Sequence, residues 1–563
     1  MTPPELAGRE ELIAWVEGRS DNYYDTSPNL AAVLDAHAGA ERRAEMEGRL
    51  RDFGGVVARV IEPCVANVER HRDLPAHVPY DGVGRRIEHV EFHPDQDVAT
   101  AATWDAGLLA CDEGPGGVFE QAALFYLLSH VGEGGVACPV VCTVGLGRAL
   151  AHRAPPELAQ RYLARVRSAR FEGALRGSQF LTEVQGGSDV GANVVVARPD
   201  VDDSGAWRIS GEKWFCSVAD ADLFVVTARP EGAPDGTRGL GCFLVPRTLD
   251  GVTPNGFAIR QLKDKLGTRA LASAEIDFTN ALGWPLGEVD EGFAVAVEEL
   301  LNTSRWLNAV GSTGLMRRAY VEAASFAKHR RAFGRAIGEI ALVREQLALM
   351  KVEEHAALSS TMALTAFVER IDRGLADERD VAVHRFLVNV NKFQTSLSAS
   401  AVVHQGIEIL GGNGTIESFS VLPRLYRDAV VYESWEGTHN VLCAQVARDC
   451  ARHGLLEHVA SWLEERLDSL DGPSVAVVTG AKQSVLASLR EAVDGGEARA
   501  GEVRRLLERV ARVIQATTLL GEASSGSSEK RAVAELFLCA HLSDGSTAGY
   551  PSELLDPVLA HDV

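Results

Sequence analysis

The chain has 563 residues, and its formal net charge at pH 7 is -22. Phosphate groups repel an acidic surface, so this charge argues against broad binding to nucleic acids or anionic membranes. The length predicts several units that each bury a core of their own, and no apolar run approaches the roughly 18 residues that span a bilayer. The N-terminal residues lack the basic and apolar regions of a secretory signal, so we expect a cytoplasmic protein.

Three segments of different character follow one another. Residues 1–178 are predicted to be mainly helical, with Gly- and Pro-rich interruptions. Between about 190 and 280, short runs rich in β-branched residues are bounded by Gly, Pro and Asp, which indicates a small β-domain. These runs are residues 194–196, 207–209, 224–227, 243–245 and 275–278. From about 291 to 450, apolar residues return at helical intervals, as between Arg344 and Glu369.

The residues after Cys450 predict a helical extension. Helical periodicity appears at residues 456–470, 485–493 and 503–520, whereas Ser524–Ser528 is typical of a flexible loop. The extension has eleven Lys and Arg against seventeen Asp and Glu. The predicted fold is therefore α+β and multidomain. Its parts are an N-terminal helical domain (1–178), a middle β-domain (179–290), a C-terminal four-helix bundle (291–450) and an acidic helical extension (451–563).

Nine cysteines are scattered along the chain. The sequence contains no Cys-x-x-Cys pair and no Cys/His set at the spacing of metal ligands. We therefore expect reduced, mostly buried cysteines and no metal site.

Glu436 is the strongest candidate for a catalytic group. It follows Trp435 and precedes a tight Gly437-Thr438 turn. Desolvation beside an apolar ring raises the pKa of a carboxylate towards the working pH, which suits a base that removes a proton from carbon. The alternative is that Glu436 only caps a helix that begins at Gly437-Thr438.

Other segments have the composition of ligand-binding loops. The Gly-rich run Leu181–Val190 allows backbone N–H groups to approach a ligand closely. An arginine in Lys328–Gly334 suits a diphosphate, because its planar guanidinium makes two parallel hydrogen bonds. These segments, together with Gly211–Ser217, Leu410–Gly414, Leu422–Asp428 and Trp435–Asn440, resemble the motifs of the acyl-CoA dehydrogenase family.

The resemblance implies the three-domain fold of that family and an activity. The expected reaction is FAD-dependent α,β-dehydrogenation of an acyl-CoA or acyl-carrier thioester. Glu436 would remove the α-proton, and flavin N5 would accept the β-hydride, because no side chain can take a hydride. The backbone N–H of Glu436 would polarise the thioester carbonyl. An electron-transfer flavoprotein as acceptor and a homo-oligomer, dimer or tetramer, are also implied.

The same resemblance assigns roles to individual residues. Phe215 and Ser217 stand where the family often has Trp and Thr, Glu408 where it often has Gln, and Asn302 where relatives have Asp. The implied cofactor contacts are Leu181, Thr182, Ser188, Phe215, Ser217, Arg330, Phe333, Glu408, Gly411, Gly412, Trp435, Thr438 and Asn440. The implied substrate contacts are Ser188, Asn302, Arg305 and Gly437. Alternatives are an ordinary buried aromatic for Phe215, a solvated basic face for Arg330 and a surface ion pair for Arg305.

Several features are similar to the AidB-like branch of the family. They are the segment Arg86–Pro94, the variants Gln185–Gly187 and Lys213–Phe215, and the extension. This branch suggests a second hypothesis, a flavoprotein with weak dehydrogenase activity and a protective, nucleic-acid-binding or ligand-binding role. The acidic extension argues against DNA binding. A flavin oxidase or monooxygenase on the same fold is a third hypothesis.

Overall fold

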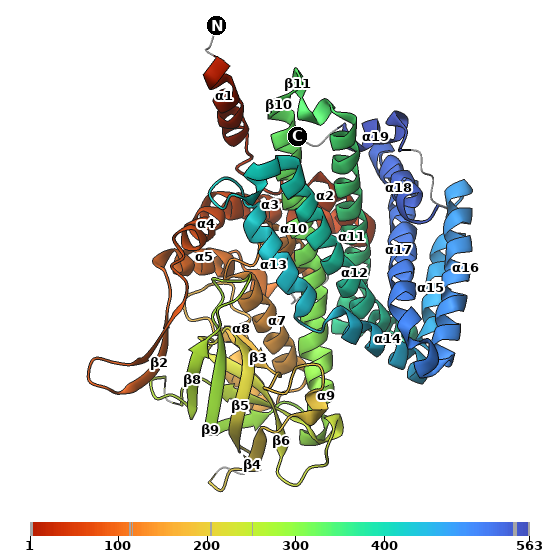
Figure 1. Ribbon diagram of the computed structural model, residues 1–563. Helices are drawn as coiled ribbons and strands as arrows, with labels where there is room; N and C mark the ends of the chain where they lie inside the picture. The colour runs from red at the N-terminus through yellow and green to blue at the C-terminus, as the bar shows by residue number, and fades with distance from the viewer. Residues whose placement is uncertain are drawn as a thin grey trace. The chain divides into compact units, whose positions relative to one another are not determined.

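Residues 4–111, 114, 116–202, 205–249, 251–543 and 549–560 are described by the computed structural model, shown in Figure 1. The chain divides into two units that are not continuous in sequence. The first unit comprises Met1–Arg59, Glu113–Gly132 and Asn308–Val563, and the second comprises Val60–Asp112 and Glu133–Leu307. The four ranges expected from the sequence stay a prediction.

The first unit is built from helices (Figure 1). These are α1 (Pro4–Glu17), α2 (Pro28–His37), α3 (Ala40–Val56), α6 (Gly117–Leu128), α10 (Asn302–His329, which begins in the second unit), α11 (Ala341–Asp372), α12 (Glu378–Leu410), α13 (Leu422–Ser434), α14 (His439–His453), α15 (Leu455–Asp468), α16 (Pro473–Asp494), α17 (Ala500–Ser525), α18 (Ser528–His541) and α19 (Ser552–Leu559). A two-residue hairpin, β10 (Arg331–Ala332) with β11 (Arg335–Ala336), connects α10 to α11.

The long helices α11 and α12 organise this unit. They pack against each other, and α12 also packs against α13 and α14. A capping box begins α12: the side chain of Asp377 accepts a hydrogen bond from the backbone N–H of Asp380 at 2.8 Å, and the Asp380 side chain accepts from the Asp377 N–H. The extension belongs to the same unit, because α17 and α18 pack directly on α11.

The loop expected at Ser524–Ser528 is shorter than predicted, since only residues 526 and 527 separate two helices. Helix α17 continues to Ser525 and α18 begins at Ser528. Ser527 is the N-cap of α18, where its side chain accepts a hydrogen bond from the backbone N–H of Lys530 at 3.3 Å. A serine at this place therefore starts a helix, because its oxygen satisfies one of the unpaired N–H groups of the first turn.

The second unit combines a sheet with short helices (Figure 1). Its helices are α4 (Glu62–His71), α5 (Pro94–Asp105), α7 (Ala137–His152), α8 (Pro156–Val166) and α9 (Gly292–Val295). Its strands are β1 (Ala76–Tyr80), β2 (Arg86–Glu91), β3 (Gly177–Phe180), β4 (Val196–Pro199), β5 (Trp207–Ser217), β6 (Leu223–Pro230), β7 (Gly241–Pro246), β8 (Phe257–Leu262) and β9 (Ser273–Pro285).

The strands β3 to β9 form one sheet that closes on itself. Its order is β3-β6-β4-β5-β9-β7, with β8 beside β9. Strand β7 pairs with both β9 and β6, so the path from β6 to β7 returns to its start. The β-domain expected between about 190 and 280 is present, and all five predicted runs overlap strands.

The hairpin β1–β2 differs from the mainly helical structure expected for residues 1–178. Pro79 interrupts its first strand and charged residues alternate along the second, so the local pattern gives only a weak strand signal. In the described part of the chain, no helix is long and apolar enough to cross a membrane.

Candidate active site

Glu436 lies in a short turn of the first unit, between α13 and α14. Its backbone is left-handed, with φ of 58°, and Gly437 follows with φ of 103°. A positive φ is uncommon for residues other than glycine, and such strain often occurs at functional sites. The N-cap of α14 is Thr438, two residues later. Glu436 therefore does not occupy the cap position, and its side chain is half-buried.

Two side-chain contacts hold this turn. The Trp435 ring stacks on Tyr432, with centroids 4.7 Å apart. Inside the turn, Nε2 of His439 lies 2.8 Å from a carboxylate oxygen of Glu433. Burial would raise the pKa of Glu433, but the hydrogen bond with His439 lowers it overall. A partly buried hydrogen bond between α13 and α14 therefore closes the base of the turn.

Lys392 is a further functional candidate, which the sequence reasoning missed. Its side chain comes from α12 and is fully buried. The Nζ atom donates to the backbone oxygens of Glu433 and Gly437, each at 3.0 Å. These two carbonyls lie on either side of Glu436, so one cation fixes both ends of the segment that carries the carboxylate. A lysine within an apolar helical run was the signal that could have identified it.

Four further predicted residues of this unit, Glu408, Gly411, Gly412 and Asn440, are exposed. Glu408, at the end of α12, accepts a hydrogen bond from the side chain of Gln346 at 2.8 Å. Gly411 and Gly412 follow, and a Cβ atom on either would meet nothing within 4 Å. Asn440 accepts a hydrogen bond from Arg504 of the extension at 3.0 Å. Open backbone of this kind can be approached closely by a ligand or by another chain.

Arg330 and Phe333 lie where α10 ends. Phe333 is 95% exposed, with φ of 52°, at the tip of the hairpin β10–β11. Nη1 of Arg330 lies 3.3 Å from a carboxylate oxygen of Glu11 in α1. The same Glu11 oxygen accepts the backbone N–H of Arg331 at 3.2 Å. The guanidinium predicted to bind a diphosphate therefore already has an acidic partner.

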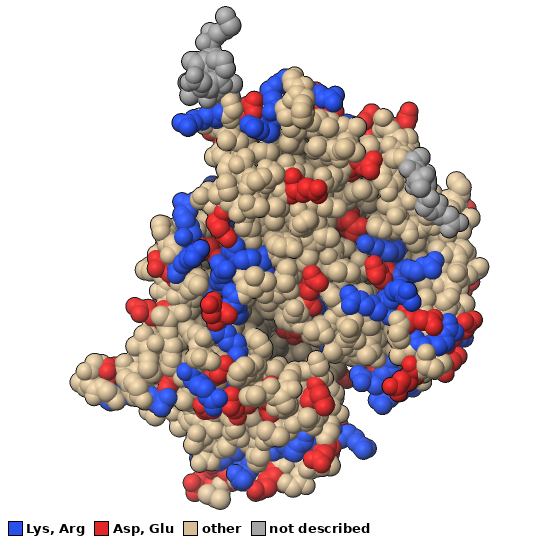
Figure 2. Space-filling model, in the orientation of Figure 1, with Lys and Arg blue, Asp and Glu red and all other residues tan. Residues whose placement is uncertain are grey.

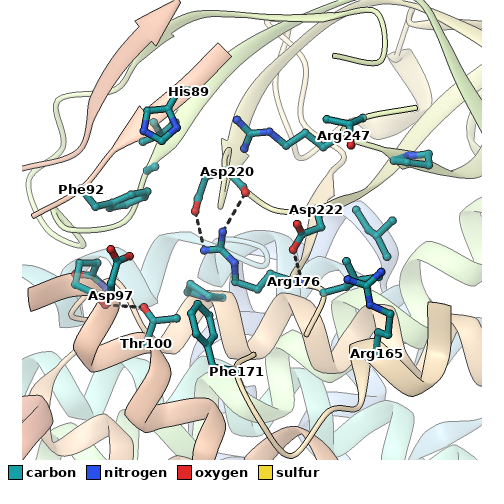
Figure 3. Close-up of a pocket in the computed structure, with 18 of the residues that line it drawn as sticks. His89, Phe92, Asp97, Thr100, Arg165, Phe171, Arg176, Asp220, Asp222 and Arg247 are labelled. Carbon is teal, nitrogen blue, oxygen red and sulfur yellow. Dashed lines mark hydrogen bonds and ion pairs between the residues drawn. The ribbon is translucent and has the colours of Figure 1, made fainter. Parts of the chain in front are cut away.

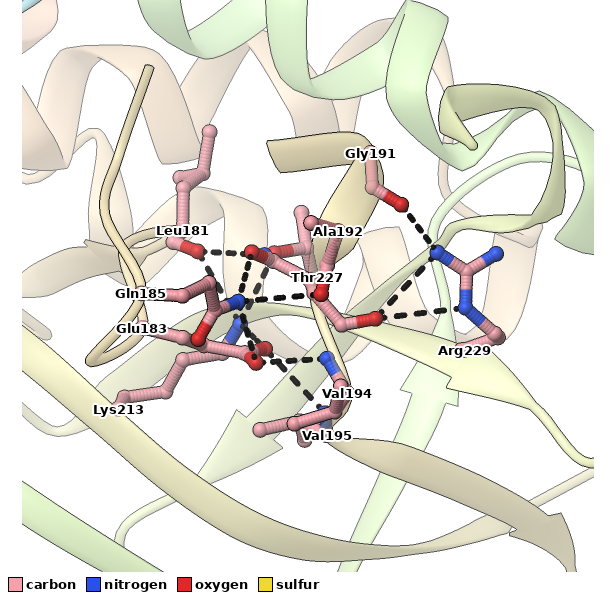
Figure 4. A network of polar contacts seen from close by, with 11 residues as sticks. Leu181, Glu183, Gln185, Gly191, Ala192, Val194, Val195, Lys213, Thr227 and Arg229 are labelled. Carbon is pink, nitrogen blue, oxygen red and sulfur yellow. Dashed lines mark hydrogen bonds and ion pairs between the residues drawn. The ribbon is translucent and has the colours of Figure 1, made fainter. Parts of the chain in front are cut away.

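In the second unit, a buried ion pair supports the loop that begins at Leu181 (Figure 4). Nζ of Lys213 lies 2.8 Å from Oε1 of Glu183 and donates to the Leu181 oxygen at 3.2 Å. The other Glu183 oxygen accepts the backbone N–H of Val194 at 2.7 Å. Burial lowers the pKa of Lys213, while Glu183 opposes this shift. The pair places Leu181 and Thr182, both half-buried, above strand β5.

Strand β5 presents Phe215 and Ser217 on the same face, because they are two residues apart. Phe215 is 50% exposed, so it is not an ordinary buried aromatic. The Nζ atom of Lys263 lies 4.8 Å from the Phe215 ring centroid. The backbone N–H of Trp214 donates to the Thr182 oxygen at 2.9 Å. The structure thus brings together the Leu181 loop and the Phe215 strand.

Asn302 and Arg305 lie in the first turns of α10, directly after a π-helical turn at Ala296–Leu301. Such turns are frequent at functional sites. The side chain of Gln179 in β3 donates to the hydroxyl of Ser304 at 2.9 Å, which ties this helix start to the sheet. Arg305 is 4% exposed, so it is not a surface residue. Ser188 is exposed.

Comparison with protein families gives three matches. Residues 290–451 match the acyl-CoA dehydrogenase, C-terminal domain, and residues 178–281 match the acyl-CoA dehydrogenase, middle domain. Residues 17–173 match the adaptive response protein AidB N-terminal domain. Together these matches cover the helical, β and helical parts in chain order.

Two curated relatives span similar shares of the chain. The AidB protein of Escherichia coli (strain K12) is 34% identical over 386 residues, which are 66% of this chain and 69% of the relative. Acyl-CoA dehydrogenase family member 11 of Caenorhabditis elegans is 30% identical over 427 residues, 72% of this chain and 68% of the relative.

Solved structures include a similar molecule that also covers the extension. Caenorhabditis elegans ACDH-11, solved in complex with C11-CoA, has a TM-score of 0.87 and 26% identity, and the match covers 94% of this chain and 93% of that chain. An acyl-CoA dehydrogenase from Bacillus anthracis complexed with FAD has a TM-score of 0.73 at 21% identity, covering 92% and 95% of the two chains, and therefore shares the fold.

Proposed function

Because the chain belongs to the acyl-CoA dehydrogenase family, with an AidB-type N-terminal part, we propose that it dehydrogenates an acyl-CoA or acyl-carrier thioester. The α-proton goes to Glu436 and the β-hydride leaves as a pair of electrons with its proton, so that the thioester becomes α,β-unsaturated. Bound FAD would supply the hydride acceptor that no side chain offers. The ACDH-11 complex with C11-CoA supports a thioester as the ligand class.

The observation that carries this proposal is the fixed, strained position of Glu436. A general base must be held within reach of one hydrogen of its substrate. Lys392 fixes the carbonyls on both sides of Glu436, and the backbone of Glu436 is held in the left-handed region, with φ of 58°. A residue that served only to start the helix would need no such arrangement. The backbone N–H of Glu436 is the proposed donor to the thioester carbonyl.

The residues present fit a flavin dinucleotide. Phe215 offers a half-exposed ring face beside the hydroxyl of Ser217, as a flat isoalloxazine requires. Leu181 and Thr182 lie over the same strand, held by the Lys213–Glu183 pair. Gly411 and Gly412 leave room for close approach to backbone. The residues of the Leu181 loop and strand β5 would hold the flavin ring, whereas Gly411 and Gly412 would approach the FAD of a neighbouring copy, and Arg330 would meet the diphosphate of that FAD once released from Glu11.

We also propose that the protein is a homo-oligomer, at least a dimer. Exposing a large apolar ring to water is unfavourable, and Phe333 is 95% exposed at the tip of a hairpin flanked by Arg331 and Arg335. A second copy whose cofactor meets this hairpin would cover the ring. Light scattering of Phe333→Asp, compared with the unchanged chain, tests whether the hairpin lies in a subunit contact.

Anaerobic titration with acyl-CoA thioesters tests the proposed activity. Thioesters of graded length and branching should bleach the flavin absorbance of the purified protein. Glu436→Gln should retain FAD but lose this reduction by at least about a hundredfold. Glu497→Gln, on an exposed residue of the extension, serves as the matched control and should be reduced normally. Unchanged reduction of Glu436→Gln would exclude Glu436 as the base.

The alternative functions give different results in simple assays. An oxidase or monooxygenase would consume oxygen rapidly with substrate, whereas a dehydrogenase passes its electrons to a carrier such as an electron-transfer flavoprotein. An AidB-like DNA-binding protein would bind duplex DNA with a steep salt dependence. Figure 2 shows acidic and basic side chains interspersed over the extension on the face in view. This mixture and the acidic balance of the extension favour the dehydrogenase.

A further inference from the structure

A cavity of about 870 Å³ lies within the second unit (Figure 3). It is bounded by hairpin β1–β2, by helices α5, α7 and α8, and by one end of the sheet. Among the described residues that line it, none is predicted to contact FAD or the thioester. Its volume is within the range of small-molecule sites, roughly 300–1,000 Å³. The proposed reaction therefore leaves this cavity without a role.

Four arginines line the cavity, and one of them is already neutralised. Nη1 of Arg176 lies 2.7 Å from a carboxylate oxygen of Asp220. The backbone N–H of Arg176 donates to Asp222 at 2.8 Å, so both aspartates converge on this residue, as Figure 3 shows. The Arg176–Asp220 ion pair therefore adds no net charge to the cavity.

Arg247, in contrast, is oriented by neutral groups. It donates to the backbone oxygen of Glu88, and its guanidinium lies 5.7 Å from the Phe257 ring centroid. Within the described ranges, no carboxylate forms an ion pair with it. Burial lowers the pKa of Arg247, Asp220 opposes this shift and Arg176 reinforces it. Arg247 is thus a partly desolvated cation whose remaining donors have no protein acceptor in the described chain.

The backbone segment that holds Arg247 is strained, and hydrogen bonds fix it in place. Glu88 has a left-handed backbone, with φ of 48°, and a fully buried side chain. Its carboxylate accepts the backbone N–H of Ile259 at 2.7 Å and lies 2.9 Å from Nε2 of His77. These bonds tie the hairpin to the sheet and direct the Glu88 carbonyl at Arg247. The cation is therefore positioned before any ligand arrives.

Two more arginines come from α8, one turn apart. Nε of Arg165 donates to the Gly173 oxygen at 2.9 Å, and the Arg161 guanidinium lies 5.0 Å from the Tyr162 ring centroid. Neither forms an ion pair with a described carboxylate. Asp97 and Asp222 also line the cavity and repel an anion, so a ligand must be held by direct contacts with the guanidinium groups.

We propose that this cavity binds a phosphate-bearing small molecule at a site separate from the thioester site. Arg247 makes two parallel hydrogen bonds to the phosphate oxygens, and Arg165 and Arg161 add charge from α8. Guanidinium forks match phosphate geometry, and several guanidinium groups suit a dianion. Phe92 and Phe171 in the lining offer apolar surface to the organic part of the ligand.

Calorimetric titration of the full-length protein with inorganic pyrophosphate tests the proposal. The protein is first saturated with FAD, so that the phosphate contacts of the cofactor are filled. We expect one saturable site per chain. Arg247→Met should weaken binding by about tenfold or more, and Arg247→Lys by less, because lysine keeps the charge but loses the fork. Arg260→Met is the control, since Arg260 lies in the same unit on strand β8 and pairs with Asp277 outside the cavity.

Arg165→Met provides a second variant, on an exposed helix face where folding is not at risk. It should weaken pyrophosphate binding several-fold without changing the melting temperature. Succinate should bind more weakly than pyrophosphate, and the affinity for an acyl-CoA thioester should be unchanged in both variants. No saturable binding of pyrophosphate, equal losses in Arg260→Met, or tighter binding of succinate would overturn the proposal. A matching loss of thioester affinity in Arg247→Met would make the cavity part of the thioester site and also overturn it.

Discussion

Nζ of Lys392 lies 3.0 Å from the backbone oxygen of Gly437, the residue that follows Glu436. The same atom reaches the oxygen of Glu433 at 3.0 Å, on the other side. A fully buried ammonium group is unfavourable unless its donors are satisfied. The two carbonyls therefore stabilise the lysine, and the lysine in turn fixes the turn that presents the proposed base.

Replacing Lys392 should slow chemistry more than it weakens thioester binding. Lys392→Met frees both carbonyls and allows Glu436 to shift, and a displacement near 1 Å at a reacting group costs about a hundredfold in rate. We expect the rate of flavin reduction at saturating thioester to fall by about ten- to a hundredfold, measured by stopped-flow absorbance. Lys392→Arg should retain more activity than Lys392→Met.

Lys351 provides the matched control. It is also a fully buried lysine, on α11, and its Nζ bonds to Glu529 and to the Val558 oxygen away from Glu436. Lys351→Met should lower stability without changing the reduction rate per bound flavin. If Lys392→Met behaves in the same way as Lys351→Met, the lysine serves only folding. In a Glu436→Gln background, Lys392→Met should cause no further loss, since the positioned base is already absent.

Replacing Lys213 should lower the stability of the protein, and replacing Glu183 as well should restore part of it. Lys213→Met leaves the Glu183 carboxylate buried without its cation, which typically costs about 3–5 kcal/mol. The double variant Lys213→Met/Glu183→Gln removes that uncompensated charge and should recover part of the loss. Denaturant unfolding measures both effects, and FAD content after gel filtration should fall in the single variant. Equal stability of the single and double variants would contradict a coupled pair.

The architecture could be read from the sequence, and the family matches confirm the predicted fold class and family. Periodicity identified the helical parts, and β-branched runs marked the strands, because these signals are local. Hairpin β1–β2 was missed, since Pro79 weakens its strand pattern and its stability depends on a contact between Glu88 and distant Ile259. The loop expected at Ser524–Ser528 is only two residues long, because Ser527 already caps the next helix.

The candidate site was also predicted only in part, because several of its contacts join residues far apart in the sequence. Motifs identified Glu436 and Phe215, whose roles stay predictions, as do those of Ser188 and Arg305. Lys392 lies in no recognised motif, and Lys213 lies in one that gave it no role. The carbonyls and carboxylate that they contact are 30 to 45 residues away along the chain. The ion pair between Arg330 and Glu11 joins residues 319 positions apart. Contacts of this range depend on tertiary packing and leave no local pattern.

Acid should destabilise the contacts of Glu522, which join α17 to α18 and to α2. Burial would raise the pKa of Glu522, but Lys530 and His37 lower it to about 2. A carboxyl with a lowered pKa adds stability above its unfolded value near 4.5, and this contribution is lost as the pH falls towards 2. The loss amounts to roughly 3 kcal/mol for this group.

Denaturant unfolding at pH 7, 4 and 3 measures this effect. Glu522→Gln should be destabilised at pH 7, where Lys530 loses its partner, and should approach the unchanged protein at pH 3. The buried Glu353, whose pKa is also lowered despite its burial, through Arg512 and His541, adds a residual acid sensitivity. Glu497→Gln should keep the full pH dependence. An identical difference between Glu522→Gln and the unchanged protein at all three pH values would exclude this linkage.

Glu11 should weaken FAD binding by competing for Arg330. The ion pair at 3.3 Å must open before the guanidinium can meet a diphosphate. Partly exposed ion pairs of this kind stabilise a protein by roughly 0.2–1 kcal/mol. Glu11→Gln should therefore tighten FAD binding to the apoprotein by about two- to fivefold. Flavin fluorescence quenching measures this affinity. Raising the ionic strength should reduce the difference, because salt screens the pair.

Glu17→Gln, at the end of the same helix, should leave FAD affinity unchanged. Weaker FAD binding in Glu11→Gln would instead mean that α1 helps to hold Arg330 in its binding geometry.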